Sequence, residues 1–250
     1  MYELKNKTAV ITGSGRGIGK DIAIALAKNG VKTVVNVKKS IDEGNNTVNE
    51  IKKYNDSILS ISDVSGIEGA KKLFNDAKNA FGNVDILINN AGIGLFSLFN
   101  DSEEKIINKI IKTNIDSTVY CSQLFSTMFN GSVIINISSL ASIVPFKGLS
   151  IYGMTKAAIN GLTRSMALEL SGKNIRVNGV APGIVKTKMG NSLLKIMNIN
   201  ENDYSERYTL TKKIIEPEEV ADAVLFLTRN ESITGQTIIM DSGQLSMFLQ

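Results

Sequence analysis

The 250-residue chain has 43% apolar and 21% charged residues, which is ordinary globular composition and enough to bury a sizeable core. Its 28 basic and 24 acidic side chains give a formal net charge of +4 without a block of like charge, so we do not expect a nucleic acid partner. The absence of histidine and the single cysteine, Cys121, exclude histidine acid/base chemistry and an internal disulfide, and they argue against a metal site.

The first residues of the chain, Met1 to Lys7, are too polar for the apolar part of a signal peptide. No apolar run in the sequence approaches the ~20 residues that a helix needs to cross a bilayer. We therefore expect a cytoplasmic protein without a membrane segment.

Short β-rich apolar runs alternate with longer helical patterns, which is typical of βαβ units around a parallel sheet. Seven strands are expected, at Thr8–Thr12, Thr33–Val37, Ile58–Ile61, Asp85–Asn89, Ser132–Ile137, Arg176–Val180 and Thr237–Met240. Helices are expected between them, including Ile18–Asn29, Ile67–Phe81, Glu103–Phe129, Ile151–Leu170 and Pro217–Thr228. The pattern predicts a Rossmann-type, doubly wound α/β sheet of seven mostly parallel strands with helices on both faces.

Repeats and linkers are absent from the sequence, so residues 1–250 are expected to form one dinucleotide-binding catalytic domain. One irregular stretch, near residues 189–215, lies between a proline-glycine turn and the last long helix. Its first part is apolar and roughly helical, and its second part is polar. The stretch suits a mobile lid over a substrate, and a plain surface excursion is the alternative.

A glycine-rich turn follows the first strand and precedes a helix. In such a turn, backbone N–H groups can approach a pyrophosphate, and the start of the helix favours negative charge. The spacing of Gly13, Gly17 and Gly19 resembles that of the short-chain dehydrogenase/reductase family. The residues of the turn that we expect to contact a cofactor are Gly13, Ser14, Gly15, Arg16, Gly17, Ile18 and Gly19.

The end of the second strand predicts which dinucleotide binds. Folds of this kind select NAD with an acid ~20 residues beyond the glycines, but Val37 occupies that position here. Arg16 and Lys38 instead flank the expected site of a 2′-phosphate, where charge-assisted bonds favour phosphate over hydroxyl. We therefore predict NADP, with the alternative that Lys38 and Lys39 are solvated surface charges.

Three further segments match the family and imply cofactor contacts. Asp63 and Val64 resemble its adenine-contacting pair, with a simple turn aspartate as the alternative. The segment Asn89-Asn90-Ala91-Gly92 matches a family motif letter for letter, and the segment 182–187 resembles the turn at the nicotinamide end. The residues expected to contact the cofactor in these segments are Asp63, Val64, Asn90, Ala91, Gly92, Pro182, Gly183, Val185 and Thr187.

Tyr152 is our candidate for the proton-transferring group. A tyrosine has a pKa of about 10 and needs a nearby cation to exchange a proton at neutral pH. Lys156, four residues later on the same predicted helix, can supply that charge. The sequence also contains Tyr208 and Lys212 at the same spacing, but only Tyr152 follows a strand end rich in serine.

Ser139, at the end of the fifth expected strand, precedes Tyr152 by 13 residues. With Lys156 these residues resemble the serine-tyrosine-lysine triad of the family, and Asn114 matches the asparagine that completes its tetrad by holding a proton-relay water. The resemblance implies that Ser139 and Tyr152 contact the substrate oxygen and that Tyr152 and Lys156 also contact the cofactor. The alternatives are a capping serine, a solvated lysine and a buried structural asparagine.

Within the family, the sequence looks most like the 3-oxoacyl-(acyl-carrier-protein) reductases of fatty acid biosynthesis, which implies a 3-oxoacyl thioester as substrate. Lys173 matches one basic residue that docks the carrier protein, whereas the shortened segment 128–131 lacks another. The residues expected to line the substrate are apolar: Leu95, Phe96, Phe146, Leu193 and Met197.

Three other functions are compatible with the fold: a sugar or polyol dehydrogenase, a non-catalytic NADP-sensing regulatory protein, and a structural protein with a vestigial site. The complete tetrad argues against the last two. The resemblance also implies a homotetramer formed through the helices expected at Glu103–Phe129 and Ile151–Leu170.

Overall fold

The computed structural model describes residues 1–248. Its strands form one sheet in the order β3-β2-β1-β4-β5-β6-β7, and each of the pairings is parallel. They are β1 (Thr8–Ile11), β2 (Lys32–Val37), β3 (Ser57–Ile61), β4 (Ile86–Asn89), β5 (Val133–Ile137), β6 (Arg176–Pro182) and β7 (Thr237–Met240). The order reverses direction between β1 and β4, which is the point where ligands gather in doubly wound sheets. The predicted fold class is confirmed.

Ten α-helices lie among the described residues. They are α1 (Gly17–Lys28), α2 (Ile41–Ile51), α3 (Ile67–Phe81), α4 (Glu104–Ile111), α5 (Ser117–Met128), α6 (Ser150–Glu169), α7 (Lys188–Ile196), α8 (Glu201–Tyr208), α9 (Pro217–Arg229) and α10 (Gln244–Phe248). Helix α9 begins where the sequence has Pro217 at the first position and a capping box between Glu216 and Glu219. The ordinary signals for helix starts thus account for this boundary.

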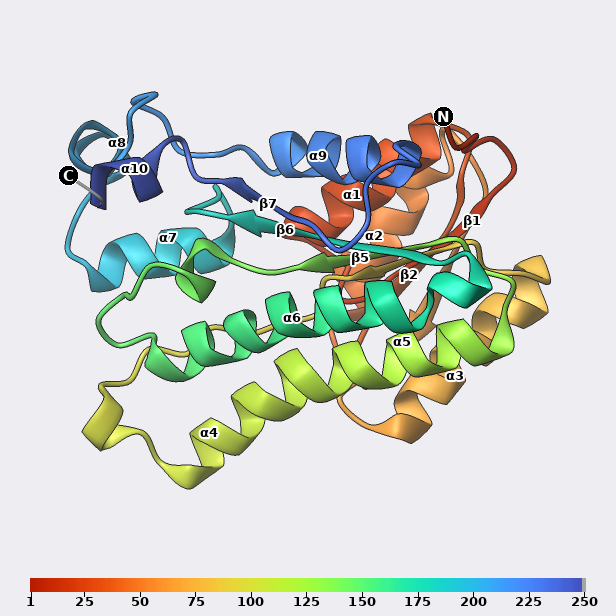
Figure 1. Ribbon diagram of the computed structural model, residues 1–250, viewed down its shortest axis with the longest axis horizontal. Helices are drawn as coiled ribbons and strands as arrows, with labels where there is room; N and C mark the ends of the chain where they lie inside the picture. The colour runs from red at the N-terminus through yellow and green to blue at the C-terminus, as the bar shows by residue number, and fades with distance from the viewer. Residues whose placement is uncertain (249–250) are drawn as a thin grey trace.

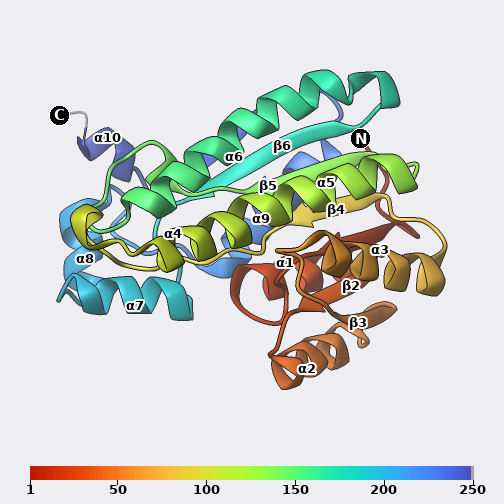
Figure 2. The same ribbon diagram turned by 90° about the horizontal axis from the view of Figure 1, so that it is seen from below.

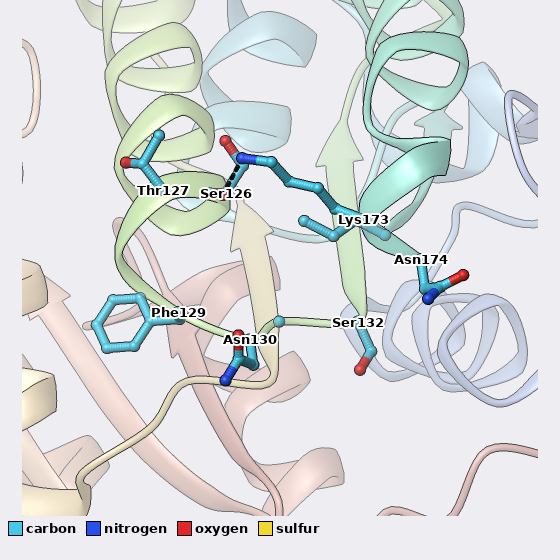
Figure 3. A pocket seen from close by; sticks show the side chains of 9 residues that line it. Ser126, Thr127, Phe129, Asn130, Ser132, Lys173 and Asn174 are labelled. Carbon is cyan, nitrogen blue, oxygen red and sulfur yellow. Dashed lines mark hydrogen bonds between the residues drawn. The ribbon is translucent and has the colours of Figure 1, made fainter.

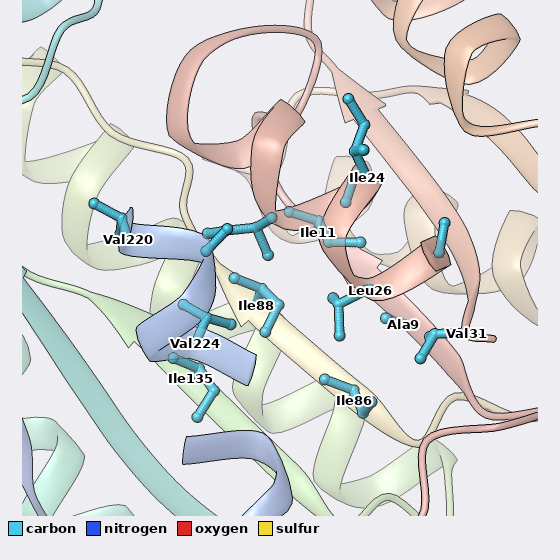
Figure 4. Packing of buried hydrophobic residues seen from close by; sticks show 14 of the residues in the cluster. Ala9, Ile11, Ile24, Leu26, Val31, Ile86, Ile88, Ile135, Val220 and Val224 are labelled. Carbon is cyan, nitrogen blue, oxygen red and sulfur yellow. The ribbon is translucent and has the colours of Figure 1, made fainter. Parts of the chain in front are cut away.

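Two layers of helices cover the sheet. Helices α1, α2 and α9 pack on one face, and α3, α5 and α6 pack on the other (Figures 1 and 2). Alternate residues of each strand point to opposite faces, so Ile86 and Ile88 join the first layer while Leu87 joins the second. Figure 4 shows the first of these cores, where Ile24 of α1 and Val224 of α9 close over the strands. Burial on both faces explains why the strand sequences are almost continuously apolar.

Three differences between the sequence prediction and the structure bear on the site. Helix α2 was not predicted, because its sequence is mostly polar and only one narrow side is buried. The helix expected at Glu103–Phe129 is split into α4 and α5 by a π-helical turn at Lys112–Asp116. The irregular segment near 189–215 contains α7 and α8, and its polar part folds as α8 around the buried Tyr204.

Cys121 is fully buried on α5, between the sheet and α3. Burial in this apolar core raises the pKa of its thiol to about 12. Across residues 1–248, every helix is too short or too polar to span a lipid bilayer.

Candidate active site

The loops that carry the predicted site residues leave the sheet at one edge, because parallel strands all end on the same side. β1 leads into the glycine turn, β4 into Asn90 and β5 into Ser139. Asn89 of β4 stands opposite Asn136 of β5, and their side chains share a hydrogen bond of 2.9 Å. This hydrogen bond between buried amides fixes the register of β4 and β5 next to the site.

Ser139, Tyr152 and Lys156 are brought together at this edge. The Lys156 ammonium, only 4% exposed, lies 5.7 Å from the centroid of the Tyr152 ring and donates to the Ile137 carbonyl at 2.8 Å. Ser139 begins a short turn, where its hydroxyl accepts the Ala141 N–H at 3.2 Å, and it is hydrogen-bonded to Tyr152. The three side chains predicted from their spacing therefore lie in one cluster.

Gly153 makes this approach of helix and turn possible. A Cβ on Gly153 would stand 2.6 Å from the Ala141 carbonyl oxygen, closer than any side chain can tolerate. The start of α6 therefore packs directly against the turn that follows Ser139. Because Gly153, the residue after Tyr152, has no side chain, the helix comes close enough to this turn for Tyr152 to reach Ser139.

Burial sets the proton affinities of the cluster. It raises the pKa of Tyr152 above its ordinary value, although the hydrogen bond with Ser139 acts in the opposite direction. Burial also lowers the pKa of Lys156 to about 8. Burial is the larger of the two causes at Tyr152, so its phenol holds its proton at neutral pH.

Asn114 is fully buried in the π-helical turn between α4 and α5. Its side-chain oxygen accepts the Ile93 N–H at 2.8 Å, and its amide donates to the Ile93 carbonyl at 3.1 Å and to Thr155 at 3.0 Å. The side chain therefore ties the loop after β4 to α6, beside Lys156. Its hydrogen bonds hold the loop after β4 and helix α6 in place next to the site.

A network that the sequence interpretation missed supports the Ser139 turn from behind. Ser142 donates to the Ser139 carbonyl at 2.6 Å, and Asn160 of α6 donates to the Ser142 hydroxyl at 2.8 Å. The signal was available, because Asn160 lies two turns after Tyr152 on the same helix. Its side-chain oxygen is buried without a hydrogen-bond partner among the described residues.

The glycine turn fits a dinucleotide pyrophosphate. Helix α1 starts after Arg16, whose side chain does not cap it, so the first-turn N–H groups have no side-chain acceptor. A Cβ on Gly19 would stand 2.4 Å from the Asn90 amide nitrogen, which donates to the Thr12 and Gly13 carbonyls at 2.9 and 3.1 Å. The hydrogen bonds of Asn90 thus fix the shape of the glycine turn, and the N–H groups of the first turn of α1 are left to bind an anion.

Asn36, which the sequence interpretation left without a role, holds the second strand against the same turn. Its side-chain oxygen accepts the Gly13 N–H at 3.2 Å, and its amide donates to the Ser62 hydroxyl at 3.0 Å. Its backbone exchanges hydrogen bonds with Ser14. A fully buried asparagine inside an apolar strand was the signal for this role.

The two cations predicted to select a 2′-phosphate lie near the turn, and each faces a carboxylate. Arg16 lies 3.1 Å from Glu43, and Lys38 lies 2.5 Å from Asp63. Burial alone would raise the pKa of Asp63, but hydrogen bonds from Lys38 and Ser65 outweigh it and lower that pKa. Glu43 was missed by sequence reasoning, because it belongs to a helix that was not predicted.

The segment after β6 reaches the other side of the glycine turn. Thr187 begins α7, where its hydroxyl accepts the Gly190 N–H at 3.2 Å, and its methyl carbon lies 3.5 Å from the place of a Cβ on Gly17. Val185 is buried and pairs with Ile215 beside it, and Val64 is buried as well. Pro182 is the last residue of β6, and Gly183 follows it.

Met189 of α7 and the Tyr152 ring both lie next to Gly94. A Cβ on Gly94 would lie 3.6 Å from the Met189 sulfur and 3.7 Å from the Tyr152 ring, so the start of α7 covers the site. The loops on either side are joined where the Ser97 N–H donates to the Gly148 carbonyl at 3.0 Å. The predicted lining residues Leu95, Phe96, Phe146, Leu193 and Met197 are half-buried or exposed.

The second tyrosine-lysine pair does not form a site. Tyr208 is the last residue of α8 and packs against Tyr204 at 5.1 Å between ring centroids. Lys212 lies beyond the helix end in a left-handed conformation, with φ of 56°, and donates to the Glu206 carbonyl at 2.6 Å. Although the two residues are four apart, their side chains therefore do not share a helix face.

Lys173 lies at the opposite edge of the sheet, away from the cluster. It lines a cavity of ≈ 530 Å³ with Asn130 and Asn174, and its ammonium donates to the Ser126 carbonyl at 2.8 Å (Figure 3). Ser132, on the same cavity, precedes β5, whereas Ser139 follows it. The length of the strand thus separates Lys173 from Tyr152 within one chain.

Comparison with known proteins shows which family the chain belongs to. The family described as short chain dehydrogenase matches residues 7–197. The 3-oxoacyl-[acyl-carrier-protein] reductase of Staphylococcus epidermidis is 34% identical over 244 residues, which cover 95% of this chain and 98% of that protein. A tropinone reductase homolog of Arabidopsis thaliana is 37% identical over 250 residues, which cover 97% of this chain and 93% of that protein.

Solved structures show the same architecture. A short chain dehydrogenase from Burkholderia cenocepacia in complex with NADP has a TM-score of 0.90 at 28% identity, over 98% of this chain and 100% of that one. The L-sorbose reductase of Gluconobacter frateurii, complexed with NADPH and L-sorbose, has a TM-score of 0.91 at 26% identity, over 98% of this chain and 99% of that one. This chain is therefore a member of the short-chain dehydrogenase family of oxidoreductases.

Proposed function

We propose that this oxidoreductase uses NADPH to reduce the ketone of a 3-oxoacyl thioester, with Tyr152 as the proton donor. The observation that carries the proposal is the cluster of Ser139, Tyr152 and Lys156 at the carboxyl edge of the sheet, next to the glycine turn. Kinship with the staphylococcal 3-oxoacyl reductase supports the substrate class. Neighbours in complex with NADP or NADPH support the cofactor.

The cofactor would be held along the glycine turn and the ends of β2, β4 and β6. The uncapped start of α1 would receive its pyrophosphate, and Arg16 and Lys38 would face its 2′-phosphate. Thr187 and Val185 would contact its nicotinamide end, beside Tyr152. When bound, NADPH supplies the hydride that goes to the carbonyl carbon of the substrate.

The proton that the reduction needs comes from the chain's own residues. Ser139 donates a hydrogen bond to the ketone oxygen, and Tyr152 passes its phenolic proton to that oxygen as the alcohol forms. The raised pKa of Tyr152 keeps the phenol protonated before the reaction, which suits reduction. Lys156 then stabilises the phenolate that remains, and Asn114 keeps the loop after β4 against α6.

The organisation around the site completes the proposal. Residues 1–250 act as one catalytic domain, since strands from Thr8 to Met240 share one sheet, and residues 189–215 act as its lid over Tyr152. Cytoplasmic location and a homotetramer stay predictions. Acyl carrier protein is proposed as the source of the thioester, and it would have to reach Tyr152 from a side other than that of Lys173 in the same chain.

A sugar or polyol dehydrogenase is the second candidate. The observation in its favour is the likeness to L-sorbose reductase over nearly the full length of both chains. Against it stand the apolar side chains around Tyr152, including Met189, which favour an acyl chain over a hydroxyl-rich ligand.

The test is a panel of acetoacetyl thioesters, tropinone-like cyclic ketones and ketoses, each assayed with NADPH and with NADH. We expect the highest kcat/KM for the thioester with NADPH. Faster reduction of L-sorbose than of any thioester would replace the substrate proposal with the second candidate. Equal use of NADH would contradict the cofactor proposal and leave the substrate proposal standing.

A further inference from the structure

Glu43 lies between two cations that come from distant parts of the chain. Its Oε1 atom is 3.1 Å from the Arg16 guanidinium and 3.0 Å from the Lys188 ammonium, and its Oε2 atom is also 3.1 Å from Arg16. Arg16 belongs to the glycine turn, Glu43 to α2 and Lys188 to the first turn of α7. One carboxylate oxygen therefore marks a point where two positive side chains converge.

The position of Glu43 is fixed by packing beneath it. Thr47 of the same helix donates to the Gly15 carbonyl at 2.9 Å, and the place of a Cβ on Gly15 is 3.4 Å from the Gly44 nitrogen. The same place is 2.6 Å from a methyl group of Val37, so the end of β2 also touches the turn. Helix α2 is thus docked on the glycine turn, and it holds Glu43 beside the spot where Val37 replaces the usual acid.

The three charged groups can exchange partners. The Glu43, Arg16 and Lys188 side chains are 32%, 58% and 76% exposed, and ion pairs this open to solvent are weak. A hydrogen bond from Lys188, together with one from Arg16, lowers the pKa of Glu43, so the carboxylate is charged at neutral pH. A phosphate monoester, with a charge of roughly −1.5 to −2 and three acceptor oxygens, is the stronger anion for the same two cations.

We propose that Glu43 is an internal competitor of the 2′-phosphate of NADP: its carboxylate holds Arg16 and Lys188 where the phosphate binds, and the phosphate must displace it. Lys188 is then a further cation of the phosphate subsite, beside Arg16 and Lys38. The inference rests on the proposed use of NADP. If the proposal is right, Glu43 weakens the binding of NADP and reduces the preference of the protein for NADP over NAD.

The test measures binding of two cofactor fragments by calorimetry, without turnover. 2′,5′-ADP carries the 2′-phosphate, and 5′-AMP lacks it. Glu43→Gln is expected to bind 2′,5′-ADP about fivefold more tightly, the equivalent of one exposed ion pair, with 5′-AMP unchanged. Lys188→Gln is expected to bind 2′,5′-ADP several-fold more weakly, again with 5′-AMP unchanged.

Matched controls carry the same charge changes on the same helices. Glu50→Gln, on α2, removes a carboxylate that pairs with Lys20 at 2.8 Å, and Lys195→Gln removes a cation from the last turn of α7. Both controls should bind the two fragments like the wild type. Equal gains in Glu43→Gln and Glu50→Gln would show a general charge effect and overturn the proposal.

Other outcomes separate this proposal from the proposed function. If the wild type prefers 2′,5′-ADP but Glu43→Gln does not change its affinity, Glu43 is not a competitor while NADP remains the cofactor. A loss of 5′-AMP affinity in Glu43→Gln would assign the carboxylate to a ribose hydroxyl and overturn the proposal as well. If the wild type shows no preference for 2′,5′-ADP, the use of NADP fails and the competitor role fails with it.

Discussion

Two tyrosine-lysine pairs of equal spacing fold into different surroundings in this molecule. Tyr152 and Lys156 occupy the first two turns of the long helix α6, whose start packs against the turn that follows Ser139. Tyr208 ends α8, and the chain turns extended at Thr209 before it reaches Lys212. A spacing of four residues places side chains on one face only while the helix continues, so the length of the helix decides which pair can work together.

The largest expected effect is that of Tyr152→Phe. The phenol is the proposed proton donor, and loss of a general acid costs about 10²–10⁴-fold in rate. We expect kcat to fall by that factor while NADPH still binds, as measured by the fluorescence of the bound cofactor. Retention of activity by this variant would remove Tyr152 from the mechanism.

Lys156→Met is expected to change both rate and stability. Burial puts the Lys156 pKa at about 8 in the folded chain, against 10.5 ordinarily, so between these values the unfolded chain binds more protons and wild-type stability rises with pH. The rise amounts to about 3 kcal/mol in the free energy of unfolding. In Lys156→Met the free energy of unfolding should not rise in this way with pH. At pH 7 the variant should be more stable than the wild type, although the hydrogen bond to Ile137 is lost.

Urea unfolding at pH 7 and pH 10 measures this difference. Lys212→Met is the matched control, because Lys212 is exposed and its removal should leave the pH dependence of the wild type intact. The same slope in wild type and Lys156→Met would contradict the lowered pKa. The activity of Lys156→Met should be low at every pH.

Tyr208→Phe is expected to change little. Its ring packs on Tyr204 within the lid, and the phenylalanine ring keeps that contact. We expect kcat within twofold of the wild type and a free energy of unfolding within about 0.5 kcal/mol. Loss of turnover here, with Tyr152→Phe active, would reverse the assignment of the two pairs.

A small gain in stability, with no change in activity, is expected from Lys212→Gly. Lys212 has a φ of 56°, a conformation that costs a side-chain-bearing residue about 1–2 kcal/mol and glycine almost nothing. Loss of the exposed ion pair with Glu206 offsets part of the relief, so we expect about 1 kcal/mol or less in thermal or urea unfolding. The neighbouring Lys213→Gly should destabilise instead, since glycine adds chain entropy there and the ion pair between Lys213 and Glu219 is lost.

The strands could be predicted from sequence to within one or two residues, because strands covered on both faces are almost continuously apolar. Site residues that follow strand ends, such as Ser139 and Asn90, could be predicted for the same reason, since parallel strands collect their ends at one edge. The repeated structure of βαβ units leaves few alternatives for where such residues lie.

Contacts between elements could not be predicted in the same way. Glu43 meets Lys188 across 145 residues of sequence, and neither belongs to a motif. Asn160 acts on Ser139 only through Ser142, and such a relay depends on how α6 packs against a turn. Ser242, in the loop after β7, is another such contact: it takes a φ of 56°, and its carbonyl accepts the Leu210 N–H at 2.8 Å, which joins the segment 189–215 to that loop.

Cys121 of α5, buried between the sheet and α3, has a practical consequence for testing whether residues 189–215 move as the proposed lid. With a thiol pKa of about 12, its reactive thiolate amounts to on the order of one part in 10⁴ at pH 8, and the surrounding core blocks reagents. Maleimide dyes should therefore leave the wild type unlabelled. A cysteine introduced at Met197, 37% exposed on the lid, would be the sole reactive thiol, so a fluorophore there would report lid movement without removal of the native sulfur.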